Sequence, residues 1–165
     1  LLAGPNAIAG EWGHNALPFD RLRPDYDFPW TRGRPCYCGK TDCIETWLSG
    51  DGVTQSYAAL TGERWPAAEI FANSNRTETT QKTFDQYSQL CALALSTVIN
   101  LIDPDIIVLG GGLSKTPGLC QAIKSQWANY VFSDQVATSI ACARHGDASG
   151  VRGAAWLWSG QHNGA

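Results

Sequence analysis

Hydrophobic residues recur at spacings of three and four along a stretch in the middle of the chain, residues 77–102. This period places them on one face of an α-helix, and such a face must be buried against the rest of the protein. Asp103-Pro104 ends the pattern, because proline lacks a backbone N–H and pushes the preceding residue out of the α region. The apolar face consists of Phe84, Tyr87, Cys91, Leu95, Val98 and Ile102.

Shorter patterns of the same kind predict further helices on both sides of this one. Gly50 and Gly52 punctuate the first two, and Pro66 opens the third. The expected short helices cover residues 44–48, about 53–60, 66–72, about 117–131 and about 150–158.

Two short runs have the character of β-strands. Ile106-Ile107-Val108-Leu109 is a continuous apolar run, which is typical of a strand covered on both faces in a parallel or mixed sheet. Residues 138–143 predict a second strand. Helices and strands in this order are typical of an α/β layered domain. Two strands make an incomplete sheet, so we expect the chain to be a piece of a longer protein.

Composition and charge narrow the classes of partner. A length of 165 residues with 44% hydrophobic content suits one domain with a buried core. The net charge is −3, and the basic residues form no stripe that could follow phosphates. The longest apolar stretch is interrupted by polar residues and is shorter than the roughly 18 to 20 residues of a membrane span. We therefore expect a cytoplasmic protein with no nucleic-acid partner and no membrane segment.

Three cysteines, Cys36, Cys38 and Cys43, lie close together in the segment CYCGKTDC. A disulfide between any two would leave an odd thiol beside it, and Cys36 and Cys38 are too close to bridge comfortably. A structural zinc ion takes four thiolate or imidazole ligands and accounts for all three, while Gly39 permits the backbone reversal. The spacing therefore favours zinc.

The fourth zinc ligand must come from elsewhere, and the chain has three histidines. His14 is expected, because it lies in the same loop-rich region, in the segment GEWGH. His145 is the competitor, but it precedes a turn after a strand, and His162 lies in a polar tail. The other cysteines stand alone in apolar segments and are expected to be buried, reduced thiols: Cys91, Cys120 and Cys142.

The segments GEWGH and CYCGKTDCIETWLSG closely resemble the signature of the ROK family of bacterial sugar kinases and repressors. That signature is Glu-x-Gly-His followed by Cys-x-Cys-Gly-x-x-Gly-Cys-x-Glu. NLIDPDIIVLGGGLS and HGDASGVRGAAWLW resemble later segments of the family, and GEWGHNALPF resembles its fructokinase branch. Essentially the whole chain is covered.

The resemblance implies the C-terminal portion of a kinase with an α/β, ribonuclease H-like fold of the actin and hexokinase type. A zinc-stapled, sugar-binding loop region would occupy residues 1–45, and a helical and α/β part residues 46–165. Two departures from the family pattern are Asp42, where a glycine is usual, and a longer gap between His14 and Cys36.

The family also implies roles for individual residues. Glu11, His14 and Glu45 would face the sugar, with the carboxylates accepting hydrogen bonds from its hydroxyl groups. Taken alone, an acid in such a position is more typical of an exposed loop or a helix start than of a binding site, and for Glu45 the resemblance to the family reverses this interpretation. Structural zinc would be held by His14, Cys36, Cys38 and Cys43.

The triplet Gly110-Gly111-Gly112 follows the predicted strand 106–109. Backbone without a Cβ can approach a phosphate or an adenosine, but such triplets are also ordinary tight turns, and this one matches no standard phosphate-binding motif. The resembled kinases contact ATP, bound with Mg, through this turn. Their phosphate loop and catalytic Asp would lie upstream of residue 1, so no catalytic residue is assigned.

The expected function of the intact protein is ATP-dependent phosphorylation of a hexose, with fructose to fructose 6-phosphate as the expected reaction and a homodimer as the expected assembly. The present segment alone is expected to be inactive. Two alternatives remain open: a sugar-sensing ROK transcriptional regulator, which would carry a DNA-binding domain ahead of this region, and a zinc-stabilised interaction module without a sugar site.

Overall fold

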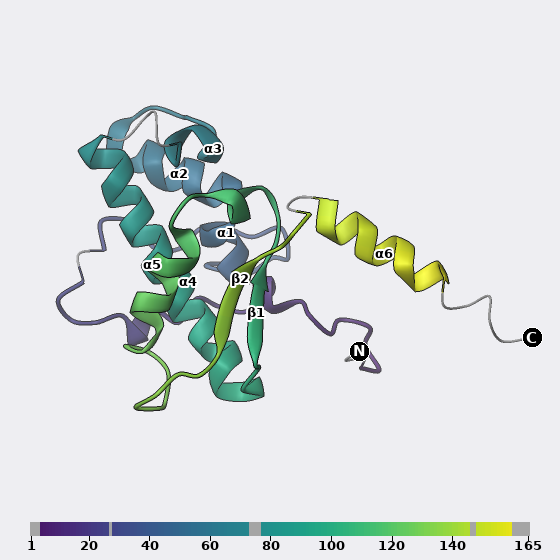
Figure 1. Cartoon of the computed structure of the whole chain (residues 1–165). Coiled ribbons are helices and arrows are strands. Elements are labelled where there is room, and N and C mark those ends of the chain that lie inside the picture. Colours follow the sequence, from purple (N-terminus) through teal and green to yellow (C-terminus); the bar gives the residue numbers. More distant parts are fainter. Residues whose placement is uncertain (1–3, 27, 73–76, 146–147, 160–165) are drawn as a thin grey trace, which may run out of the picture.

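The long helix α4 (Glu78–Ile102) contributes to both apolar clusters of the fold and packs against α1, α2 and α5. The computed structural model describes residues 4–26, 28–72, 77–145 and 148–159. Figure 1 shows helices α1 to α3 toward one end of α4, and the two strands with α5 along it. The other elements are the 3₁₀ turns η1 (Trp12–His14), η2 (Phe19–Arg21) and η4 (Gly112–Lys115), the helices α1 (Ile44–Leu48), α2 (Gly50–Thr61), α3 (Ala67–Ile70), α5 (Leu119–Trp127) and α6 (Ser149–Ser159), and the strands β1 (Ile106–Leu109) and β2 (Ser139–Cys142).

Both ends of α4 have a local cause. At its start, the Thr77 hydroxyl accepts a hydrogen bond from the Thr80 backbone N–H, and the Thr80 hydroxyl accepts one from the Thr77 N–H. This reciprocal pair satisfies two donors that the first turn of a helix leaves free. At its end, Asp103 adopts a left-handed conformation with φ of 48° immediately before Pro104. The predicted helix over 77–102 is confirmed to within a residue.

Two apolar clusters anchor the fold on α4. The larger one joins α4 to α2, α3 and α5 and includes Leu93 and Trp127, which are 0% and 2% exposed. The smaller one is rich in aromatic residues and fixes the loop region to α1 and α4. Its buried members are Leu17, Phe19, Trp30, Ile44, Trp47, Leu90 and Ala94. The loop region 1–45 therefore has an apolar anchor of its own.

The described sheet has two parallel strands, in which Ile106 pairs with Ser139 and Leu109 with Cys142. Helix α5 forms the crossover between them, as a parallel connection requires. Both strands were expected, but the expectation that β1 is covered on both faces is wrong. Ile106 and Val108 are 51% and 57% exposed, because the described chain packs on only one face of the strand.

The helix boundaries follow the expected ones to within a few residues, with two clear differences. Helix α5 (Leu119–Trp127) is shorter than the helix expected over 117–131, and Gly118 before it has a left-handed conformation with φ of 80°. Gly50 begins α2 and does not separate two helices, because the Ser49 hydroxyl caps the helix by accepting from the Gly52 N–H at 3.1 Å.

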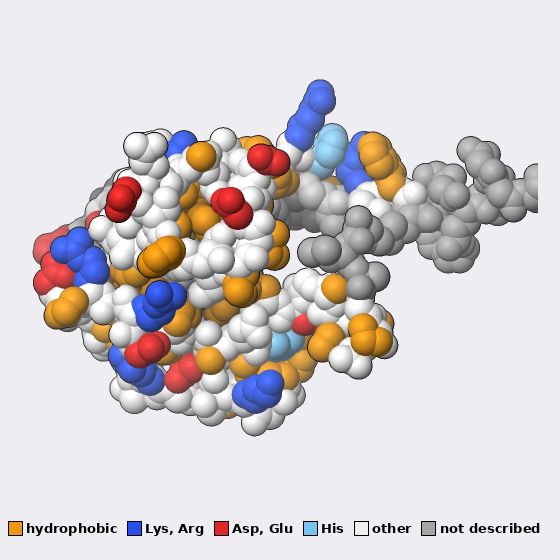
Figure 2. All heavy atoms as spheres, turned by 90° about the horizontal axis from the view of Figure 1, so that it is seen from below, with side chains coloured by type: hydrophobic (Ala, Val, Ile, Leu, Met, Phe, Trp, Pro, Cys, Tyr) orange, Lys and Arg blue, Asp and Glu red, His pale blue; other side chains and the backbone are white. Residues whose placement is uncertain are grey.

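Helix α6 projects away from the other elements in Figure 1. None of the described helices is long and apolar enough to cross a membrane. Figure 2 shows acidic and basic side chains interspersed on the face that it displays.

Gly52 marks the closest approach between α1 and α2, and this makes a testable prediction. A Cβ at Gly52 would lie 2.7 Å from the backbone oxygen of Thr46 and 2.7 Å from the backbone carbon of Trp47. Backbone atoms cannot move aside as a flexible side chain can, so Gly52→Ala is expected to lower the free energy of unfolding by about 2–3 kcal/mol. Denaturant titration followed by circular dichroism measures this change.

Gly50→Ala is the matched control, because its Cβ would meet only the Ala67 Cβ at an ordinary 3.9 Å. We expect it to change the free energy of unfolding by less than about 1 kcal/mol. Equal effects of the two substitutions would contradict the steric explanation.

Candidate functional site

Three sulfur atoms and one imidazole nitrogen converge near the start of α1. The cluster of His14, Cys36, Cys38 and Cys43, called the Cys–His cluster below, has all its ligand atoms within 4.8 Å of one another. His14 ends the turn η1, and Cys43 directly precedes α1. Among the residues that the structure describes, this is the one group of this kind that could hold a metal ion.

The spacing of these atoms fits a tetrahedral zinc ion. Zn–S bonds of about 2.3 Å and a Zn–N bond of about 2.0 Å place two sulfurs about 3.8 Å apart, and a sulfur and a nitrogen about 3.5 Å apart. The Cys38 and Cys43 Sγ atoms are 3.6 Å apart, and His14 Nδ1 lies 3.5 Å from Cys36 Sγ. Thiolates with one imidazole are a typical donor set for structural zinc.

Backbone pairing explains how His14 reaches cysteines more than twenty residues away. Ala16 and Cys43 form an antiparallel bridge, flanked by hydrogen bonds from the Leu17 N–H to the Asp42 carbonyl and from the Ile44 N–H to the Asn15 carbonyl. The segment that follows His14 therefore runs beside the segment that leads into α1.

The cysteine turn is closed by its own hydrogen bonds. The Cys36 N–H donates to the Lys40 carbonyl at 2.8 Å, and the Gly39 N–H donates to the Cys36 carbonyl at 3.0 Å. Gly39 has φ of 84°, a left-handed conformation that glycine adopts without strain. The expected reversal at Gly39 is confirmed.

Asp42 replaces the usual glycine of the family pattern without changing the backbone conformation that a glycine favours. Its φ is 55°, which Asp tolerates better than most residues. Its carboxylate accepts hydrogen bonds from the Gly33 N–H at 2.7 Å, the Arg34 N–H at 3.0 Å and Trp47 Nε1 at 3.2 Å. The carboxylate thus ties the chain before the cysteine turn to α1.

The thiols of the cluster differ in their environments. The Lys40 backbone N–H, as a hydrogen-bond donor, lowers the pKa of Cys38 to about 7. Burial, followed by the neighbouring thiols, raises the pKa of Cys43 to about 12. Three sulfurs around one point cannot all ionise at low cost unless a cation neutralises them. The cluster is therefore suited to a cation.

His14 presents its second ring nitrogen to a group of polar side chains. Nε2 lies 2.7 Å from the Tyr37 hydroxyl, 3.8 Å from Glu11 Oε2 and 3.7 Å from Glu45 Oε2. The two carboxylates are 62% and 46% exposed, so both can reach a ligand in solvent. The structure brings together the three residues that were expected to face a sugar.

A hollow of about 230 Å³ adjoins this group. Its lining includes Tyr37, Glu45, Asp51 and Gln55. Tyr37 was not expected at this site; its ring packs edge-on against His14 with centroids 4.9 Å apart. Its position between two cysteines of the turn is the signal that could have identified it.

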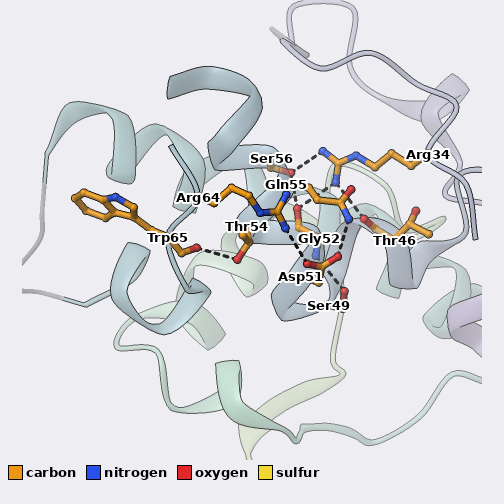
Figure 3. A network of polar contacts seen from close by, with 10 residues as sticks. All are labelled: Arg34, Thr46, Ser49, Asp51, Gly52, Thr54, Gln55, Ser56, Arg64 and Trp65. Carbon is orange, nitrogen blue, oxygen red and sulfur yellow. Dashed lines mark hydrogen bonds and ion pairs between the residues drawn. The ribbon is translucent and has the colours of Figure 1, made fainter. Parts of the chain in front are cut away.

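Arg34 contacts α1 and α2 next to the site. Its guanidinium stacks 3.5 Å from the centre of the Trp47 ring. Figure 3 shows it reaching the Thr46 carbonyl at 3.0 Å, the Gly52 carbonyl at 3.1 Å and the Ser56 hydroxyl at 2.9 Å. Burial lowers the pKa of Arg34 to about 10, so the side chain stays protonated at neutral pH. This contact was not expected from the sequence.

The glycine triplet lies where β1 ends, at the same edge of the sheet as the end of β2. A Cβ on any of the three glycines would meet no atom within 4 Å, so the turn is open on its outer side. Gly111 has φ of 81°, which requires glycine or a strained backbone. The open carboxyl edge of a parallel sheet is a common place for ligands.

An apolar cavity of about 200 Å³ lies beside the glycine triplet. Gly110 and Leu109 line one side, and Trp12 and Leu48 line another. Trp12 follows Glu11 directly, and its ring Nε1 donates to the Thr97 hydroxyl of α4 at 3.3 Å. Trp12, beside Glu11, and Gly110 of the triplet therefore line the same cavity.

The competing histidine is placed elsewhere. His145 is exposed beyond the end of β2 and is not part of the Cys–His cluster. His162 lies outside the described residues.

The match to a known family decides what kind of protein carries this site. Residues 1–161 match the ROK family. The chain belongs to the ROK family. Its curated relatives include the N-acetyl-D-glucosamine kinase of Escherichia coli O157:H7, 37% identical over 158 residues, which span 94% of this chain and 51% of the relative. The corresponding kinase of Salmonella paratyphi B is also 37% identical over the same spans.

Solved structures of ROK proteins have the same fold. The ROK hexokinase from Thermus thermophilus superposes with a TM-score of 0.73 at 23% identity, over 97% of this chain and 51% of the hexokinase. A ROK glucokinase from Streptomyces griseus, in complex with glucose and AMPPNP, also gives 0.73 at 22% identity, over 92% of this chain and 51% of that one. The α/β, actin- and hexokinase-like fold is confirmed. The chain spans about half the length of the relatives it matches.

The Cys–His cluster of this ROK chain predicts one zinc ion per chain. Cys38→Ser replaces a thiolate with a hydroxyl, which is a poor ligand for zinc, and is expected to reduce bound zinc by at least about tenfold. Metal analysis of protein purified without chelator measures the stoichiometry. Cys142→Ser, a change at an exposed cysteine outside the cluster, should retain the metal. Wild-type protein with no zinc and oxidised cluster cysteines would refute the site.

Arg34→Met is expected to lower the free energy of unfolding by about 3 kcal/mol. The substitution retains an apolar stem over Trp47 but removes the charged donor from the carbonyls of Thr46 and Gly52 and from the Ser56 hydroxyl; the Gly52 carbonyl keeps the Ser56 hydroxyl as a donor at 2.9 Å. Arg32→Met is the matched control, because Arg32 is exposed and stacks only on aromatic rings, 4.8 Å from the centre of Phe19. It should cost less than about 1 kcal/mol. Denaturant titration compares the two, and a small effect at Arg34 would contradict its supporting role.

Proposed function

We propose that the intact protein phosphorylates a hexose with ATP, and that this part of it supplies the metal-stapled sugar site and one side of the nucleotide site. The observation that carries the proposal is the convergence of Glu11, His14 and Glu45 on the outer edge of the Cys–His cluster. The Glu11 and Glu45 carboxylates lie 3.8 Å and 3.7 Å, respectively, from His14 Nε2. The curated relatives with 37% identity are kinases of an amino sugar, which supports this class of substrate.

In this proposal the sugar hydroxyls donate to the carboxylates of Glu11 and Glu45. Carboxylates accept strong, directional hydrogen bonds, and two acids held at fixed separation recognise hydroxyl groups in a defined orientation. The acids are positioned by short, rigid elements, since Glu11 precedes η1 and Glu45 lies in the first turn of α1. A rigid site lowers the ordering cost of binding.

Zinc would be held by His14, Cys36, Cys38 and Cys43, and its contribution would be structural. Four protein ligands fill a tetrahedral shell, so the ion would have no open position for a substrate. Its effect would be to fix the loop, and with it the imidazole that faces the sugar.

The glycine triplet, residues 110–112, is the proposed contact with ATP. Its backbone is open to an approaching ligand, and it lies at the carboxyl edge of the sheet. Phosphoryl transfer depends mainly on positioning and on neutralising phosphate charge. In the proposed enzyme, the base that deprotonates the sugar hydroxyl and the ligands of Mg lie outside residues 1–165.

Two hexoses are the leading substrates. Fructose is proposed because the segment GEWGHNALPF resembles the fructokinase branch. N-acetyl-D-glucosamine is the second candidate, because it is the substrate named for the relatives at 37% identity. The regulator alternative has weaker support, since a ROK family transcriptional regulator superposes with a TM-score of 0.53 at 20% identity.

A coupled assay of the full-length protein with ATP against a panel of hexoses tests the proposal. We expect turnover of fructose or N-acetyl-D-glucosamine with a kcat/KM at least about tenfold above that of the other sugars. Hexose binding in calorimetry without turnover would indicate a regulator, and neither binding nor turnover would indicate an interaction module.

Glu45→Gln in the same assay is expected to lower kcat/KM for the sugar by about 10- to 100-fold, because a charged hydrogen-bond acceptor becomes a neutral one. Glu63→Gln changes an exposed acid in the turn after α2 and should leave the kinetics unchanged. Equal behaviour of the two variants would remove Glu45 from the sugar site.

A further inference from the structure

Two cysteines outside the Cys–His cluster are in contact. Cys120 lies in the first turn of α5 and Cys142 is the last residue of β2, yet their Sγ atoms are 2.9 Å apart. This distance is shorter than the 3.6 Å between Cys38 and Cys43 and exceeds a disulfide bond of about 2.05 Å by less than one ångström. The expectation that both thiols are isolated and buried is therefore wrong.

The pair differs from Cys91, the other cysteine outside the Cys–His cluster, in access to solvent. Cys142 is exposed and Cys120 is partly buried, whereas Cys91 is buried inside α4. Burial raises the pKa of Cys91 to about 12 and that of Cys120 to about 11. Cys142 is therefore the thiol that a reagent in solution meets first. Among the described residues, this pair belongs to no group with enough ligands for a metal ion.

The surrounding backbone holds the two sulfurs in place. Cys142 is paired with Leu109 in the parallel sheet, and the Ala143 N–H donates to the Leu109 carbonyl at 2.7 Å. Helix α5, which carries Cys120, packs against β2 and is fixed in the main core by Ile123 and Trp127. Bond formation thus requires only a small local shift.

We propose that Cys120 and Cys142 form a reversible disulfide, and that they are a redox modification site of this protein. The co-reactant is a low-molecular-weight disulfide of the glutathione class. The Cys142 thiolate attacks one sulfur of that disulfide and displaces one glutathione thiolate, which takes up a proton. The Cys120 sulfur then attacks Cys142, gives up its proton and displaces the second glutathione. Two protein thiols are oxidised to one disulfide, and one small disulfide is reduced to two thiols.

The position of the bond suggests its effect. Leu109, the partner of Cys142, directly precedes Gly110, and Cys120 follows the turn η4 that leads out of the glycine triplet. The disulfide would link α5, which follows the triplet, to β2, which pairs with β1, the strand that precedes the triplet. Resting on the proposed function, oxidation is then expected to change the KM for ATP by about three- to tenfold.

Peptide mapping tests the disulfide independently of any activity. The full-length protein is equilibrated with mixtures of reduced and oxidised glutathione, quenched with acid, alkylated and digested with trypsin without reductant. We expect a cross-linked pair of peptides, residues 116–124 joined to residues 125–144, that disappears in excess reduced glutathione. The Cys91 peptide of the same digest is the internal control and should carry no glutathione.

Single substitutions test the order of the steps. Cys120→Ser should accumulate a glutathione adduct on Cys142, whereas Cys142→Ser should leave Cys120 largely unmodified. Recovery of both cysteines of the wild-type protein as separate peptides, alkylated or glutathionylated, would overturn the proposal.

Kinetics separate this inference from the proposed function. A changed KM for ATP in the oxidised wild type, absent in Cys142→Ser, supports the coupling to the glycine triplet. An unchanged KM with the cross-link fully formed would overturn that coupling. The absence of kinase activity in the reduced full-length protein would refute the proposed function. The peptide map would still show whether the disulfide between Cys120 and Cys142 forms.

Discussion

The Cys–His cluster is the constraint on which the site depends. The described part of the loop region before α1 contains little regular structure, and its two isolated bridges, Ala16–Cys43 and Pro35–Thr41, pair segments of this region with each other. One imidazole and three sulfurs within 4.8 Å of one another close this region on itself. Glu11 and Glu45 precede and follow the cluster in the chain, so whatever fixes the cluster also fixes the distance between the two acids.

Support for the cluster comes from charged groups that are satisfied by the backbone. Asp42 accepts from two backbone N–H groups and an indole, and Arg34 donates to two carbonyls and a hydroxyl. Trp47 is shared by both, since it donates to Asp42 and lies under Arg34. A charge is tolerated in such a partly buried position because its hydrogen-bonding capacity is filled. These contacts therefore hold the cysteine turn and helix α1 together.

The sequence predicted the elements well and their environments less well. The helix over 77–102 was predictable because local signals, a threonine pair and Asp103-Pro104, coincide with a long apolar period. The exposure of Ile106 and Val108 was not, because a run of apolar residues says nothing about which layers are present to cover it. His14 was predictable from the number of ligands that zinc needs. Arg34 and the thiol pair depend on contacts between distant segments, which leave no periodic or spacing signal in one sequence.

The two nitrogens of His14 point in opposite directions, and this has a consequence for polarity. A metal on Nδ1 leaves the single ring proton on Nε2, which makes the outer edge of a neutral imidazole a hydrogen-bond donor. The carboxylates of Glu11 and Glu45 beside it can only accept. A hydroxyl group is both donor and acceptor, so one that enters between them satisfies both requirements at once, as the Tyr37 hydroxyl, 2.7 Å from Nε2, does on the imidazole side. Choice of tautomer by the metal would thus set which face of a polyol this edge accepts.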